Sequence, residues 1–297
     1  MDIEKAFDYL ENFEKIKLTL TNRDKILDYS INQLKISYDV FGFLNTLKFN
    51  KLSEKKESLS IEEAIIKANI VRITHFIHSI VILSENKSTN IETLQVLQRI
   101  HFESCINLLY ITKETTTLKI RISNYINKSL KDLREILNKE LRPNELDKES
   151  GFKNPIIANR IEGSINEVLN RVGIKENEIT NNSSWGSFKS RYTDVITDKN
   201  FYNLSYSSAS SSVHGNFDLV FKYYTNGNTE SGFSLNNYPK KNDFRVISAI
   251  NSYSFILMVH LVKTYLSKED TDKIKFLINK LIDINKELIS QDEEFLI

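Results

Sequence analysis

The sequence predicts an all-α protein, mainly a helical bundle, with one small β-hairpin near residues 219–235. Only 3 prolines and 8 glycines interrupt 297 residues, and apolar residues recur at spacings of three and four, which is the helical period. The hairpin is predicted because β-branched and aromatic residues on both sides flank Asn226-Gly227, a common hairpin turn pair.

Capping residues define where the predicted helices begin and end. Thr21-Asn22 and Ser60 precede apolar periodic runs, and Glu63 stands at capping-box spacing from Ser60. Gly173 is a natural helix stop. The expected helices, in chain order, span residues 3–18, 22–47, 61–83, 90–112, 117–141, 156–172, 202–213, 241–267 and 269–291.

A charged loop at 51–58 suggests a division of the chain. We expect an N-terminal helical region at 1–58 and a helical bundle core domain at 59–297, which could also form one continuous domain.

Composition narrows the classes of function. Basic residues (40) balance acidic ones (39), which argues against a nucleic-acid or membrane-surface binder that acts through net charge. Cys105 is the only cysteine, so an intramolecular disulfide is impossible. The start of the chain lacks a signal pattern, and the most apolar run, 79–83, is too short to span a bilayer. We therefore expect a cytoplasmic protein with no membrane association.

No sequence motif for a cofactor or metal is visible. The chain has neither a Walker loop nor a Gly-x-Gly-x-x-Gly run, and no standard spacing of metal ligands. We therefore expect no cofactor and no metal.

The helix expected at 90–112 is apolar on every side, which is typical of a central, buried helix. Arg99 and Glu103 nevertheless lie at i, i+4, where their side chains can pair. Two interpretations stay open: a structural ion pair that fixes helix packing, and the wall of a polar pocket.

The segment from Tyr202 to His214 is the most unusual one in the chain. Tyr202, Tyr206 and His214 fall on one side of a helix, and Ser211 is three residues before the histidine. One interpretation is a site in which His214 acts as acid, base or phosphate contact beside a tyrosine and a serine. The other is a serine-rich helix that packs closely against a neighbour, with His214 as a hydrogen-bonded end residue.

Taken together, these motifs resemble a widespread bacterial domain of unknown function, distantly similar to HEPN-type helical proteins. The resemblance covers roughly residues 60–265. It is carried by five short motifs in this order: Arg99-x3-Glu103, Arg121-x3-Tyr125, Trp185, Tyr202-x3-Tyr206 and Ser211-x-Val213-His214-Gly215. The resemblance implies an all-helical fold and a setting in bacterial conflict or phage defence, with no established activity.

Three functions are then open. The first is a defence effector that cleaves RNA as a metal-independent, HEPN-like ribonuclease. Its expected catalytic residues are His214, Tyr206 and Ser211, and its expected substrate-binding residues are Arg99, Arg121, Tyr202, Glu103 and Tyr125. The second is a non-catalytic binding or adaptor module of a defence or toxin system, in which the same residues form a buried polar network. The third is a nucleotide pocket. Expected partners are RNA or a nucleotide, a second copy of the chain, or another protein of the system.

Overall fold

The structure is a computed structural model, and it describes part of the chain. The described residues are 23–47, 49, 59–85, 91–141, 155–175, 184–196, 202, 206, 225–228, 232–235, 243–266 and 268–294. They are almost all helical, which confirms the all-α class. The helix predicted at 3–18, the loop at 51–58 and most of the helix predicted at 202–213 lie outside these residues.

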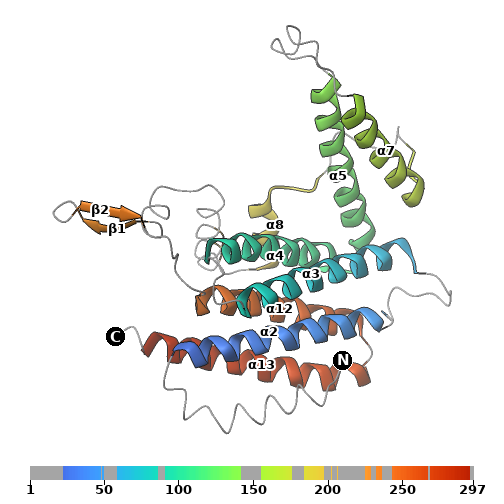
Figure 1. The fold of residues 1–297 in the computed structure, drawn as a ribbon. Helices are drawn as coiled ribbons and strands as arrows, with labels where there is room; N and C mark the ends of the chain where they lie inside the picture. Colours follow the sequence, from blue (N-terminus) through green and yellow to red (C-terminus); the bar gives the residue numbers. More distant parts are fainter. Residues whose placement is uncertain are drawn as a thin grey trace. The chain divides into compact units, whose positions relative to one another are not determined.

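Two compact units divide the chain. The first comprises Met1–Lys113 and Tyr192–Ile297, and the second comprises Glu114–Arg191. Five helices form the described body of the first unit, side by side in Figure 1. They are α2 (Arg23–Thr46), α3 (Ile61–Glu85), α4 (Ile91–Thr112), α12 (Phe244–Tyr265) and α13 (Lys268–Glu294).

Helix α12 packs against α2, α4 and α13 of the first unit. Most of its side chains are buried, on more than one face. Helix α2 also packs against α3 and α13, and α3 packs against α4. A helix that is apolar on several faces needs neighbours on each of them, and this arrangement supplies them.

Local sequence explains where several of these helices begin and end. The hydroxyl oxygen of Ser60 accepts a hydrogen bond from the backbone N–H of Glu63 at 3.2 Å, which confirms the predicted cap. Asp243 caps α12 in the same way through the N–H of Arg245, at 2.9 Å. At the end of α4, the imidazole of His260 and the hydroxyl of Tyr265 donate to the carbonyl oxygen of Thr112, at 3.0 and 3.3 Å.

The second unit is built on α5 (Leu118–Leu141) and α7 (Pro155–Val172), which pack against each other. Helix α7 ends as predicted, because Gly173 has a φ of 71° and its N–H donates to the carbonyl of Leu169 at 2.9 Å. A short helix that the sequence did not predict, α8 (Phe188–Val195), begins in the second unit and ends in the first.

The hairpin near 219–235 is not supported in its predicted form. Two short strands, β1 (Thr225–Asn228) and β2 (Gly232–Leu235), pair antiparallel, with Thr225 opposite Leu235. The predicted turn at Asn226-Gly227 is wrong, since both residues lie inside β1. A local turn preference does not fix the register, because the same residues are compatible with several loop lengths.

Two described helices, α3 and α12, are long and apolar enough to cross a membrane by length and composition alone. Within the first unit, 67% of the apolar window of α12 is buried, against 39% for α3. A core helix passes the same test, so the finding is weak evidence for a membrane span.

Candidate functional site

Helix α4 presents Arg99 and Glu103 on one side, four residues apart. The Nε of Arg99 donates to Oε1 of Glu103 at 3.0 Å, so the predicted ion pair forms. The two side chains are 19% and 37% exposed. The pair therefore lies at a boundary with solvent and is not sealed inside the bundle.

Tyr206 joins this pair from a distant part of the sequence. The Nη2 of Arg99 donates to the hydroxyl of Tyr206 at 2.8 Å, and its guanidinium carbon lies 4.7 Å from the centre of the tyrosine ring. Tyr202 stacks on Tyr206, with ring centres 5.1 Å apart and planes 16° from parallel. We call Arg99, Glu103, Tyr202 and Tyr206 the tyrosine–arginine cluster.

Aromatic contacts connect this cluster to the core of the first unit. The ring of Tyr202 lies 5.0 Å from that of Tyr192, and Tyr206 lies 6.5 Å from Phe102. Phe102 also contacts Tyr192 at 5.8 Å and Tyr253 of α12 at 4.2 Å. Phe102, Tyr192 and Tyr253 are fully buried. The cluster is thus the partly exposed end of a continuous aromatic path, which fixes where its side chains lie.

The cluster keeps its arginine charged. Partial burial alone would lower the pKa of Arg99, but its hydrogen bond to the carboxylate of Glu103 and the nearby Tyr206 raise this pKa above its usual value. Burial also raises the pKa of Tyr202, and Tyr206 adds to the effect. Tyr202 therefore remains a neutral phenol at physiological pH.

This arrangement allows the hydroxyl of Tyr206 to donate its proton to another group. Its hydroxyl oxygen accepts a hydrogen bond from a cation, so its own proton is directed to another group. The same cation stabilises negative charge that develops on that oxygen. An incoming phosphate would have to compete with Glu103 for Nε of Arg99 and with Tyr206 for Nη2, because these two groups already accept hydrogen bonds there. The geometry therefore favours Arg99 as the residue that positions Tyr206.

Two other predicted residues, Arg121 and Tyr125, lie on α5 in the second unit. Tyr125 packs against Trp185 with ring centres 5.1 Å apart. One residue earlier, Asn124 donates to the hydroxyl of Ser184 at 2.6 Å. The Arg-x3-Tyr motif and the single tryptophan thus meet within this unit, where they fasten the loop before α8 onto α5.

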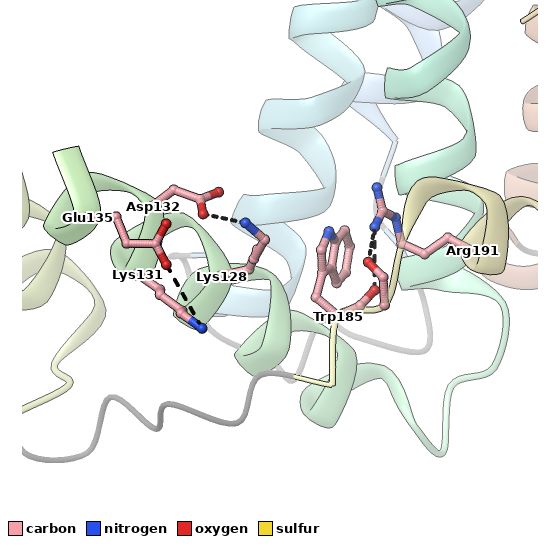
Figure 2. A network of polar contacts seen from close by, with 7 residues as sticks. Lys128, Lys131, Asp132, Glu135, Trp185 and Arg191 are labelled. Atoms are coloured by element: carbon pink, nitrogen blue, oxygen red, sulfur yellow. Dashed lines mark hydrogen bonds and ion pairs between the residues drawn. The ribbon is translucent and has the colours of Figure 1, made fainter.

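Arg191 also contacts this loop, as Figure 2 shows. Its guanidinium carbon lies 4.7 Å from the ring of Trp185, and its Nη1 donates to the carbonyl of Gly186 at 2.7 Å. Gly186 has a φ of 69°, a backbone conformation that favours glycine. The ion pairs on α5 in the same figure, such as Lys131 with Glu135 at 4.0 Å, are largely exposed and contribute little stability.

The remaining predicted site residues, Ser211 and His214, lie outside the described residues. The structure thus brings together four of the eight predicted residues. Two more lie in the second unit.

Sequence reasoning missed a second polar group, on the inner side of α4. His101 lies with its Nε2 3.0 Å from the hydroxyl of Ser254 and 3.5 Å from the sulfur of Cys105. The hydroxyl of Ser254 donates to the carbonyl of Ile250, so it accepts from the histidine. All three side chains are fully buried. Burial lowers the pKa of His101 to about 4 and raises that of Cys105, so both stay neutral.

Comparison with known proteins gives one match. The model of a family of unknown function (DUF5677) matches residues 63–234. This range includes α3 from residue 63 onward, all of α4, α5, α7 and α8, and the whole tyrosine–arginine cluster. No curated protein and no solved structure gives a significant match.

Proposed function

The chain belongs to this family of unknown function, DUF5677, and from that premise we propose that it is a cytoplasmic effector of a bacterial defence system. Its proposed activity is metal-independent cleavage of RNA, like that of HEPN-type ribonucleases. The hydrogen bond between Arg99 and the hydroxyl of Tyr206 carries the proposal. It joins two motifs 107 residues apart at a position that solvent reaches.

The proposed reaction uses the 2′-hydroxyl of RNA as an internal nucleophile. His214 takes the proton of this hydroxyl, and the bond between O2′ and phosphorus forms. The bond from phosphorus to the 5′-oxygen breaks, and Tyr206 supplies the proton for that leaving oxygen. The products are a 2′,3′-cyclic phosphate and a free 5′-hydroxyl.

The other residues have supporting roles in this proposal. Arg99, paired with Glu103, holds Tyr206 and stabilises the charge left on its oxygen. Ser211 assists His214, and Tyr202 contacts the nucleotide. These assignments follow the order of the motifs in the sequence.

A second candidate function is favoured by the aromatic path. Tyr202 and Tyr206 connect through Phe102 and Tyr192 to the buried core, and Glu103 neutralises Arg99. These are the features of a structural network that holds a segment in place. The protein would then be a non-catalytic binding or adaptor module that docks a defence protein or a second copy of itself.

One experiment separates the two functions. Wild type, His214→Ala and His75→Ala are expressed in bacterial cells, and growth, total RNA integrity and the melting temperature of each purified protein are measured. His75 is an exposed histidine of α3 and serves as the matched control. The ribonuclease proposal expects RNA degradation and growth arrest that only His214→Ala abolishes, at an unchanged melting temperature.

Two outcomes contradict the ribonuclease proposal. RNA degradation that persists in a folded His214→Ala protein would exclude the histidine as the base. Intact RNA with wild type, together with a lower melting temperature for His214→Ala alone, would support the adaptor module instead.

A further inference from the structure

Three buried carboxamide side chains connect α2, α12 and α13 in a closed circuit. Asn251 of α12 donates through Nδ2 to the carbonyl oxygen of Ser30 on α2, at 3.0 Å. Gln33 of α2 donates through Nε2 to the carbonyl oxygen of Leu281 on α13, also at 3.0 Å. Asn285 of α13 completes the circuit through its contacts with α12. We call Gln33, Asn251 and Asn285 the carboxamide ring.

Asn285 returns the circuit to α12 through three contacts. Its Nδ2 lies 3.0 Å from the hydroxyl of Ser252 and 3.4 Å from the carbonyl of Ser248. Its Oδ1 accepts from the hydroxyl of Ser248 at 3.2 Å. Each of the three helices therefore donates hydrogen bonds from one amide to the next helix. Three of the acceptors are backbone carbonyls that already belong to a helix.

The polar atoms of the carboxamide ring are buried away from water, and only some of them have hydrogen-bond partners. Gln33 and Asn251 are fully buried, and Asn285 is 3% exposed. Within the part of the chain that the structure describes, Oε1 of Gln33 and Oδ1 of Asn251 have no hydrogen-bond partner, and neither do the hydroxyls of Ser30 and Ser37. Each of these oxygen atoms has lost water without a replacement, which lowers stability relative to an apolar side chain of the same shape.

A side chain that costs stability in a core can still determine how the core assembles. Apolar side chains pack in several axial alignments of two helices, whereas a carboxamide satisfies its N–H groups only where a carbonyl lies opposite. We propose that the carboxamide ring fixes the axial alignment of α2, α12 and α13 at a cost in stability. This inference does not rest on the proposed RNA cleavage.

The alignment of α12 has a consequence for α4. The same helix contacts α4 through Ser254 with His101 and through Tyr253 with Phe102. Phe102 lies against Tyr206 of the tyrosine–arginine cluster. A displacement of α12 along its axis would therefore move the residues that support the cluster, so the ring positions that cluster indirectly.

The test removes the amide groups of the carboxamide ring and measures the axial alignment of α2 and α12 directly. Gln33→Met, Asn251→Leu and Asn285→Leu are combined, since these replacements keep side-chain shape while removing all amide groups. Spin labels at Asp28 and Lys263, exposed positions of α2 and α12, report the distance between the two helices. The proposal expects one narrow distance distribution for the native ring, and for the variant a broader one or a second population displaced by about 5 Å, one helical turn.

Matched controls separate the effect of losing the carboxamide ring from the effect of the Asn→Leu replacement itself. Asn32→Leu and Asn279→Leu make the same replacement on α2 and α13, at a half-buried and an exposed position outside the ring, and they should leave the distribution unchanged. All proteins carry Cys105→Ala, which removes the only native thiol. The melting temperature of the triple variant should equal or exceed that of the native ring in the same background.

Two results would overturn the proposal: a triple variant with the native narrow distribution, or one with a broad distribution that the controls also show. If the triple variant does not fold, the pair Gln33→Met and Asn251→Leu is measured instead, because it leaves the contacts of Asn285 intact. A single native distance in a folded pair variant would equally contradict the role of the ring.

Discussion

The two sides of α4 use polar side chains in opposite ways. On the outer side, Arg99 and Glu103 form an ion pair that solvent reaches, and Arg99 binds Tyr206. On the inner side, His101 and Cys105 are fully dehydrated and neutral, and the histidine is held by Ser254. Only the outer side can meet a ligand without unfolding the bundle. The inner side instead makes the stability of the bundle depend on pH.

The largest expected effect is loss of stability in acid through His101. Burial places the pKa of His101 at about 4 in the folded protein, against 6.5 for a free histidine. The unfolded chain therefore takes up this proton first as the pH falls, and stability declines from about pH 6.5 down to about pH 4. The full loss is roughly 3 kcal/mol by proton linkage.

Urea unfolding of wild type and His101→Gln at pH 7 and pH 4.5 measures this effect. Wild type should lose roughly 2 kcal/mol more than the variant between these two pH values, because glutamine has no proton to gain. The pKa of the half-buried His260 is also lowered by burial, but this residue is present in both proteins, so its effect cancels. Equal losses in the two proteins would show that His101 is not the neutral, buried group described here.

A smaller effect is expected on the outer side of α4. A double-mutant cycle compares wild type with Arg99→Gln, Tyr206→Phe and the double variant. Its coupling free energy should be about 1 kcal/mol, as for a charged hydrogen bond that solvent partly reaches. A parallel cycle at the exposed pair Lys131 and Glu135 should give a coupling near zero. A coupling of several kcal/mol at Arg99 would instead mark the cluster as a structural element of the core and favour the adaptor module.

The helices could be predicted from sequence because their signals are local. The start at Ser60, the stop at Gly173 and the i, i+4 pair of Arg99 with Glu103 each depend on residues within one or two turns. Helix α8 was missed because its eight residues are too few to show a clear helical period of apolar residues.

The site was only partly predictable, because its contacts are long-range. Nothing near Arg99 indicates that Tyr206 binds it from 107 positions away, and only the order of the family motifs linked them. No such signal links His101 to Ser254 or Asn251 to Ser30, which are 153 and 221 positions apart. A single Asn, Ser or His in an apolar helix does not specify its partner, which the packing of helices decides.

The most direct test of the central claim is RNA cleavage by purified Tyr206→Phe beside its melting temperature. This variant removes one oxygen from the outer side of α4 and leaves the aromatic path in place. We predict a cleavage rate at least about 100-fold below wild type, as for loss of a proton donor, with a melting temperature within a few degrees. Full cleavage by a stable Tyr206→Phe protein would contradict the proposed role of the tyrosine–arginine cluster.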